Sequence, residues 1–155
     1  MKIFKKTLLV LLLALVLIQF YRPEKNVAEY RDVASFEAET KPSLEIKSIL
    51  ENNCYDCHTN KTKYPWYAEI APISYVIADH VEEGSEHFNV SKWESYNRKK
   101  KDHKLDELME EVEEGEMPIK EYSLIHGDMT KEEKEALINW AKQARENYLV
   151  GDDIQ

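Results

Sequence analysis

The chain begins with its longest apolar run. Lys2, Lys5 and Lys6 precede an uncharged stretch over residues 7–21, TLLVLLLALVLIQFY. Positive charge followed by apolar residues is the order found in export segments, whose lysines stay on the cytoplasmic side. We therefore predict that residues 1–22 form a signal-anchor or signal peptide. The rest of the chain would then lie on the periplasmic side of the inner membrane.

The length of this segment leaves two outcomes open. Fifteen helical residues span about 22 Å, whereas the hydrocarbon core of a bilayer is about 30 Å thick. This favours a cleaved signal and a soluble periplasmic protein. However, no small-x-small cleavage site follows the run, and Tyr21 and Arg22 suit a membrane interface. We favour a retained, single-pass N-terminal membrane helix.

Beyond the apolar run, the hydrophobic pattern predicts a helical domain. Residues 23–42 are charged and lack a sustained apolar period, so we expect a solvated linker, with packing of Val33 and Phe36 back on the domain as the alternative. Apolar residues then recur at helical spacing, and no strand pattern of similar quality appears. The predicted helices are 43–53, 72–83 with a stop at Gly84, a short one from 91, 105–115, and one starting at the capping box Thr130–Glu133. The fold class is all-α, with one domain over residues 43–150.

The two cysteines of the chain lie together in Cys54-Tyr55-Asp56-Cys57-His58. Two thiols three positions apart, followed directly by histidine, are the attachment signature of a c-type haem. Cys54 and Cys57 would bind the haem covalently, and His58 would be an axial ligand of its iron.

Two other interpretations of the cysteine pair compete with haem attachment. A Cys-x-x-Cys pair also occurs in reversible dithiols and in zinc sites. A zinc ribbon needs a second ligand pair, which the scattered His80, His87, His103 and His126 do not supply. A thioredoxin-like dithiol is expected near a strand-helix-strand pattern, whereas these surroundings indicate helices. We therefore favour covalent haem c.

Met117 is the preferred second axial ligand of the iron. It lies in Gly115-Glu116-Met117-Pro118, between two predicted helices and 59 residues after His58. A thioether there could reach the haem face opposite the imidazole, although methionine also commonly fills gaps in cores. His126, on a predicted loop, is the alternative ligand.

Charge limits the classes of partner. The net charge is −9, and the part after the first twenty residues has −12, because three lysines and no acid are removed with them. A nucleic-acid partner is therefore not expected. The acidic domain would suit a basic docking face on a redox protein, although the acids could equally serve only to keep it soluble.

These motifs together resemble cytochrome c, and more closely the small bacterial haem-binding domain proteins with a short membrane segment, Cys-x-x-Cys-His and a Met-Pro loop. The resemblance extends through CYDCHTNKTKYPWYAEIAPISYVIADHVEEG, SKWESY and GEMPIKEYSLIHGDMTKEEKEALINW. It implies a cytochrome c-like fold with the haem in a crevice and Met117 facing His58. It also suggests that the Pro72 carbonyl orients His58, and that Tyr64, Trp66 or Tyr122 contacts the propionates.

The expected function is that of a membrane-tethered monohaem c-type cytochrome that carries single electrons between protein partners. No catalytic residue is expected, because two protein ligands close both axial positions of the iron. The alternative is a haem-based sensor or haem-dependent peroxidase with a labile sixth ligand.

Overall fold

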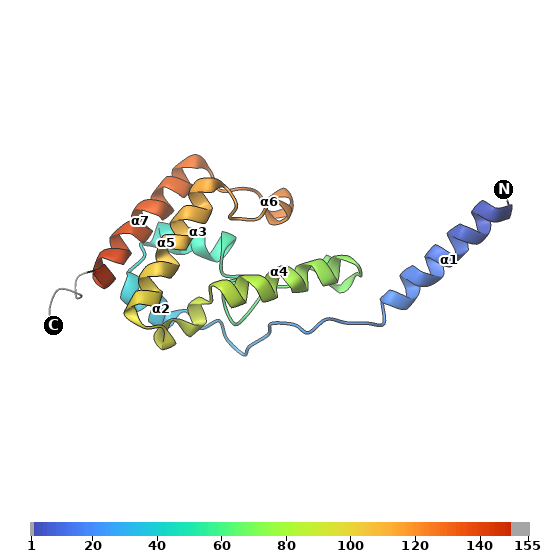
Figure 1. Cartoon of the computed structure of the whole chain (residues 1–155), viewed down its shortest axis with the longest axis horizontal. Coiled ribbons are helices and arrows are strands. Elements are labelled where there is room, and N and C mark those ends of the chain that lie inside the picture. Colours follow the sequence, from blue (N-terminus) through green and yellow to red (C-terminus); the bar gives the residue numbers. More distant parts are fainter. Residues whose placement is uncertain (1, 150–155) are drawn as a thin grey trace.

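The computed structural model describes residues 2–149, and this part of the chain is helical, without a β-sheet (Figure 1). The predicted domain end at Val150 and the first residue of the predicted export segment lie outside the described residues. The elements are α1 (Lys2–Ile18), α2 (Ala34–Thr40), α3 (Leu44–Asn53), the 3₁₀ helix η1 (Trp66–Glu69), α4 (Ile73–His87), the 3₁₀ helix η2 (Val90–Ser95), α5 (Arg98–Glu114), α6 (Lys120–His126) and α7 (Lys131–Leu149).

Helices α5 and α7 lie side by side and form the centre of the domain, with α3 packed against α7 (Figure 1). The apolar stripe predicted from residue 105 faces this core, where Leu105 is fully buried. Gly115 ends α5 in a left-handed conformation with φ of 78°. The predicted capping box is also present, since the Thr130 and Glu133 side chains each bind the other residue's backbone N–H.

The segment predicted to be a solvated linker contains part of the core. Its helix α2 places Phe36, which is 0% exposed, edge-on against Trp93 and Trp140. Glu39 on the same helix accepts hydrogen bonds from Lys101 and Tyr148, at 2.8 Å in each case. The linker prediction is therefore wrong for α2. A seven-residue helix with one large apolar side chain shows no periodic pattern, yet it can bury that side chain between longer helices.

Helix α4 continues beyond the stop predicted at Gly84 and ends at His87. Glycine lowers helix propensity by about 1 kcal/mol but does not by itself end a helix. Here the absence of a side chain allows another segment to approach α4 closely, as described below.

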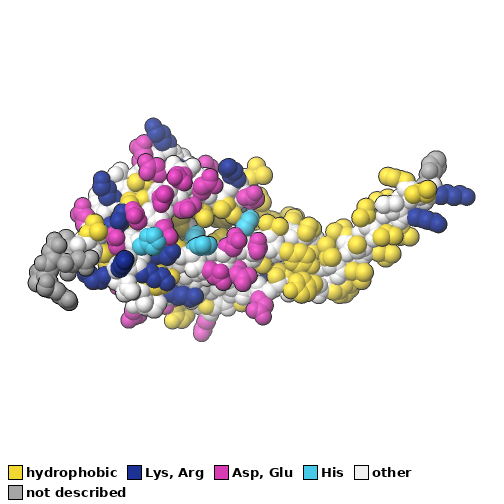
Figure 2. Space-filling model, in the orientation of Figure 1, with side chains coloured by type: hydrophobic (Ala, Val, Ile, Leu, Met, Phe, Trp, Pro, Cys, Tyr) yellow, Lys and Arg dark blue, Asp and Glu magenta, His cyan; other side chains and the backbone are white. Residues whose placement is uncertain are grey.

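The N-terminal helix α1 extends away from the domain and has no buried residue (Figure 1). Exposed apolar side chains line most of its visible face (Figure 2). Across residues 2–149, no helix combines the length and the apolar character needed to cross a membrane.

Candidate functional site

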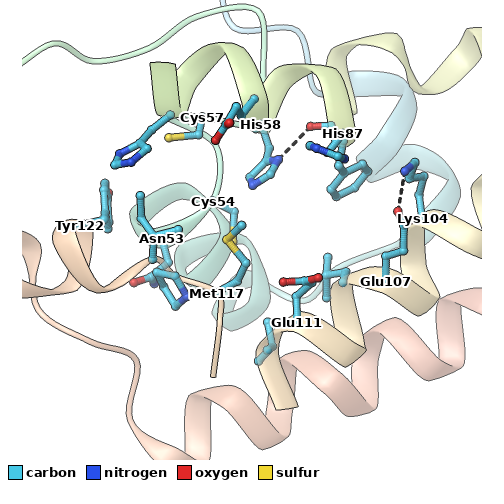
Figure 3. Close-up of a pocket in the computed structure, with 18 residues that line it drawn as sticks. Asn53, Cys54, Cys57, His58, His87, Lys104, Glu107, Glu111, Met117 and Tyr122 are labelled. Atoms are coloured by element: carbon cyan, nitrogen blue, oxygen red, sulfur yellow. Dashed lines mark hydrogen bonds and ion pairs between the residues drawn. The ribbon is translucent and has the colours of Figure 1, made fainter. Parts of the chain in front are cut away.

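The Cys-x-x-Cys-His motif forms a tight turn at the end of α3. Cys54 caps this helix, and its carbonyl oxygen accepts hydrogen bonds from the N–H groups of Cys57 at 3.2 Å and His58 at 3.0 Å. The turn brings both thiols and the imidazole to one cavity (Figure 3). The structure thus brings together three of the residues that the sequence singles out.

His58 presents one ring nitrogen that is free to bind a metal. Its Nδ1 lies 2.8 Å from the carbonyl oxygen of Phe88 (Figure 3). Because a carbonyl can only accept, Nδ1 carries the proton, and in the neutral ring Nε2 keeps its lone pair. Burial lowers the pKa of His58, despite hydrogen bonds to backbone carbonyls that oppose the shift. The hydrogen bond to Phe88 and the lowered pKa both favour the neutral ring with its proton on Nδ1. This is a form in which histidine binds metals, through Nε2.

The residue that orients His58 differs from the one expected. The resemblance to cytochromes suggested the carbonyl of Pro72, which precedes α4, whereas Phe88, which caps the end of α4, supplies it. The sequence could not show this because the partner is a backbone group, and any residue has a carbonyl. What placed Phe88 beside His58 is the path of α4 across the motif.

Helix α4 can pass close to the Cys54–His58 turn because residue 84 is a glycine. A Cβ atom at Gly84 would lie 3.1 Å from the Cβ of Cys57 and 3.5 Å from Cε1 of His58. The first distance is too short for ordinary van der Waals contact. Glycine is therefore needed here for close packing against the motif, although its backbone conformation is helical.

The environment of the two thiols opposes a role as a reactive dithiol. Burial, together with the neighbouring Cys57, raises the pKa of Cys54 to about 12. Burial and the charge of Asp56 raise the pKa of Cys57 to about 11. Catalytic dithiols instead have a lowered thiol pKa. Among residues 2–149, no group of three or more His, Cys, Asp or Glu side chains could hold a metal ion.

Met117 reaches the same cavity from the opposite side, on the segment between α5 and α6 (Figure 3). Its backbone N–H donates to the Glu111 carbonyl at 3.0 Å, which ties this segment to the end of α5. The alternative ligand His126 does not line the cavity. It lies on α6 rather than on a loop, where it stacks on Tyr122 and contacts the Tyr67 hydroxyl at 2.9 Å.

The cavity has a volume of about 350 Å³, within the range of small-molecule and cofactor pockets. Its walls come from α4, α5, the motif and the Met117 segment. Tyr122 lines it as the resemblance suggests, whereas Tyr64 and Trp66 do not. The charged and imidazole side chains around it are His80, Glu83, His87, Lys104, Glu107 and Glu111.

The sequence interpretation missed His80 and His87 as lining residues. Together with Gly84 they have the spacing i, i+4, i+7, which places them on one face of α4. This spacing could have identified both histidines as lining residues, but only if the predicted helix was extended past Gly84.

Residues before α2 form hydrogen bonds with the motif and with the residues on either side of it. Arg31 donates to Asp56 inside the motif at 2.5 Å and to Glu51 on α3 at 2.9 Å. Asn26 donates to the carbonyl of Thr59 just after the motif at 2.8 Å. Segment 26–32, expected to be part of a solvated linker, thus holds the loop that carries the two cysteines and the histidine.

These features define a helical domain with a cavity whose walls include an imidazole, two thiols and a thioether. A family model described as the haem-binding domain matches residues 13–143. The chain belongs to this family. Neither a curated protein nor a solved structure matched it.

The residues in the cavity fit a haem. The motif supplies an imidazole with a free Nε2, and the two cysteines lie on the same turn. Leu108, Val112 and Ile119 provide apolar surface for a flat macrocycle. The raised pKa values keep both partly buried thiols protonated at neutral pH, so they are present as thiols and not as a charged pair.

Proposed function

We propose that this protein is a monohaem c-type cytochrome that carries single electrons between extracytoplasmic protein partners. One observation carries the proposal: the Cys54–His58 turn and Met117 meet across a single cavity, and the Nδ1 of His58 is held by the Phe88 carbonyl. The family match supports haem binding in general.

Each of four residues has a defined task in this proposal. Cys54 and Cys57 would hold the haem through thioether bonds, and His58 and Met117 would ligate its iron. The iron would supply one-electron chemistry. With His58 and Met117 both supplied by the chain as iron ligands, the haem would serve electron transfer rather than substrate binding, which suits a carrier.

The location and partners follow from charge and from α1. The three lysines at the start of α1 would stay on the cytoplasmic side, and α1 would tether the domain to the inner membrane. Acidic side chains spread over the visible face of the domain (Figure 2), consistent with its net negative charge. They would favour a basic docking face on a redox protein.

The proposal is tested on the full chain matured in a host that assembles c-type cytochromes. Mass spectrometry should find one haem added, and the haem should stay bound through acid–acetone extraction. The mass also shows whether the N-terminal residues are retained. Colourless protein, or haem that is extracted by acid–acetone, would contradict the proposal.

Met117→Ala tests the second ligand. The oxidised wild-type protein should show the weak band near the red end of the visible spectrum that reports thioether ligation, and Met117→Ala should lose it. Met109→Ala is the matched control, because Met109 is also partly buried but packs against the core and does not line the cavity. An unchanged spectrum in Met117→Ala would exclude Met117. A high-spin resting state that binds carbon monoxide in the wild type would instead favour the sensor or peroxidase.

A further inference from the structure

The end of the domain nearest α1 exposes a group of large apolar side chains. Trp66 is 76% exposed, Ile70 42%, Ile73 43% and Val76 48%. They come from η1, the turn after it and the first turn of α4, two elements that pack together. We call these four residues the apolar end surface. An exposed cluster of this kind is usually covered by a partner or a membrane.

The apolar end surface is joined to the end of α1 by specific contacts. The amide side chain of Gln19 donates to the Ala71 carbonyl at 2.9 Å and accepts from the Ala71 N–H at 3.0 Å. The Tyr75 hydroxyl donates to the Ile18 carbonyl at 2.5 Å. The rings of Tyr21 and Tyr75 also contact each other, with centroids 5.8 Å apart. The last turn of α1 is therefore docked on the domain.

Because of this docking, hydrophobic side chains form one continuous surface from the domain along α1 (Figure 2). At 1.5 Å per residue, the 17 residues of α1 span about 26 Å, less than the roughly 30 Å of a hydrocarbon core. The apolar end surface would supply additional lipid-facing area where the helix alone is short.

The charges beside this surface are those of a membrane interface. Glu69, the acid in η1, pairs with both Arg22 and Lys25. These pairs lower the pKa of Glu69, and Lys25 has the larger effect. The carboxylate therefore stays ionised, and the two cationic side chains balance its charge. Arginine, lysine, tryptophan and tyrosine are the residues that gather at the level of the lipid headgroups.

We propose that the apolar end surface rests on the outer face of the lipid bilayer that holds α1, with Trp66 at the headgroup level. This inference rests on the proposed tether. The lipid bilayer is favoured over a second copy of the chain because the surface is continuous with α1, which would already be in lipid. The cavity residues His80, Gly84 and His87 lie further along α4, so this orientation would keep the haem site away from the membrane and open to redox partners.

Single cysteines carrying nitroxide spin labels test this orientation in the haem-loaded full chain. Positions 66 and 73 sample the apolar end surface, through Trp66→Cys and Ile73→Cys. Leu44→Cys is the matched control, because Leu44 is an exposed apolar residue (87%) on α3. Leu11→Cys reports whether α1 is in lipid. The protein is reconstituted into phosphatidylcholine–phosphatidylglycerol vesicles, and the accessibility of each label to oxygen and to a water-soluble nickel reagent is measured.

The proposal expects the oxygen-to-nickel ratio at positions 66 and 73 to exceed that at 44 and to approach that at 11. Ratios at 66 and 73 equal to that at 44 would overturn it, whether or not position 11 is in lipid. Dipolar broadening between labels at 66 or 73, with no rise in the ratio, would also overturn it and indicate a second copy. If 66 and 73 are in lipid and 11 is not, the surface contact stands and the tether through α1 fails. The mass and visible spectrum of the same samples report haem attachment separately.

Discussion

Individual atoms, rather than whole helices, decide which ring nitrogen of His58 is protonated and which could bind a metal. A backbone carbonyl, that of Phe88, holds the proton on Nδ1 and leaves Nε2 as the free nitrogen. Hydrogen bonds of this kind orient metal-binding histidines and set which nitrogen binds. The raised pKa values of the adjacent thiols oppose a role in thiol exchange.

Gly84 is the second residue on which the site depends, and its replacement should be costly. We predict that Gly84→Val lowers the free energy of unfolding by about 2 kcal/mol, because the new side chain would overlap Cys57 and His58. Urea unfolding of the haem-loaded protein, followed by circular dichroism, measures this change.

Glu86→Val is the control for Gly84→Val. Glu86 lies on the same helix but is exposed, so this variant carries only the helix-propensity cost of valine, about 0.5 kcal/mol. Equal destabilisation by the two variants would show that close packing at Gly84 is unimportant.

Among the elements, α2 shows how a short segment becomes part of a core. Phe36 lies at the centre of an aromatic cluster with Phe88, Trp93 and Trp140. This cluster joins the N-terminal segment to the residue whose carbonyl orients His58. Helix α2 therefore supports the site indirectly, although none of its residues lines the cavity.

Phe36→Ala should accordingly destabilise the domain by about 3–5 kcal/mol, the usual cost of truncating a buried phenylalanine. Tyr30→Ala, a large-to-small change at a 66% exposed position in the same segment, should change stability by no more than about 0.5 kcal/mol. Urea unfolding curves of both variants test this. A small effect of Phe36→Ala would restore the view that residues 23–42 are a linker.

In the molecule as a whole, the cavity lies between two parts of the helical domain. Helices α3 and α5 each pack directly on α7, whereas α4 packs on η1 and meets α5 across the cavity. A bound haem would therefore connect α4 to the rest of the domain through buried apolar surface. Without it, the α5–α7 pair keeps its own contacts.

This arrangement predicts uneven stability in a haem-free chain. In a Cys54→Ala, Cys57→Ala variant, amide hydrogen exchange should become faster in α4, while α5 and α7 remain protected. Exchange measured by mass spectrometry on the variant and the haem-loaded wild type makes this comparison, with α5 and α7 as internal controls. Equal protection of α4 in both proteins, with a cooperative melt, would show that haem does not hold this helix.

Much of this structure could be predicted from local patterns. The periodicity of apolar residues predicts α3, α5 and α7, and the Ser43 and Thr130 caps begin two of them. These features depend on residues within one or two helical turns of each other, so they can be recognised in the sequence. The cysteine pair and His58 lie within five consecutive positions for the same reason.

Several of the errors concern contacts between residues far apart in the chain. Phe36 is buried by helices that begin more than fifty residues later, and a seven-residue helix has too few positions to show a period. Gly84 resembles a helix stop until the nearby Cys57 is seen. His80 resembles a partly buried histidine, and His87 a solvated one, until α4 is placed over the motif.

The sequence alone therefore predicted an all-helical chain, its apolar start and the Cys-x-x-Cys-His motif. Folding in three dimensions established which carbonyl orients His58, which residues line the cavity, and how the end of α1 docks on the domain. The reason is physical. Propensity, capping and motif spacing act over a few residues, whereas burial and backbone hydrogen bonds between distant segments depend on how the helices pack.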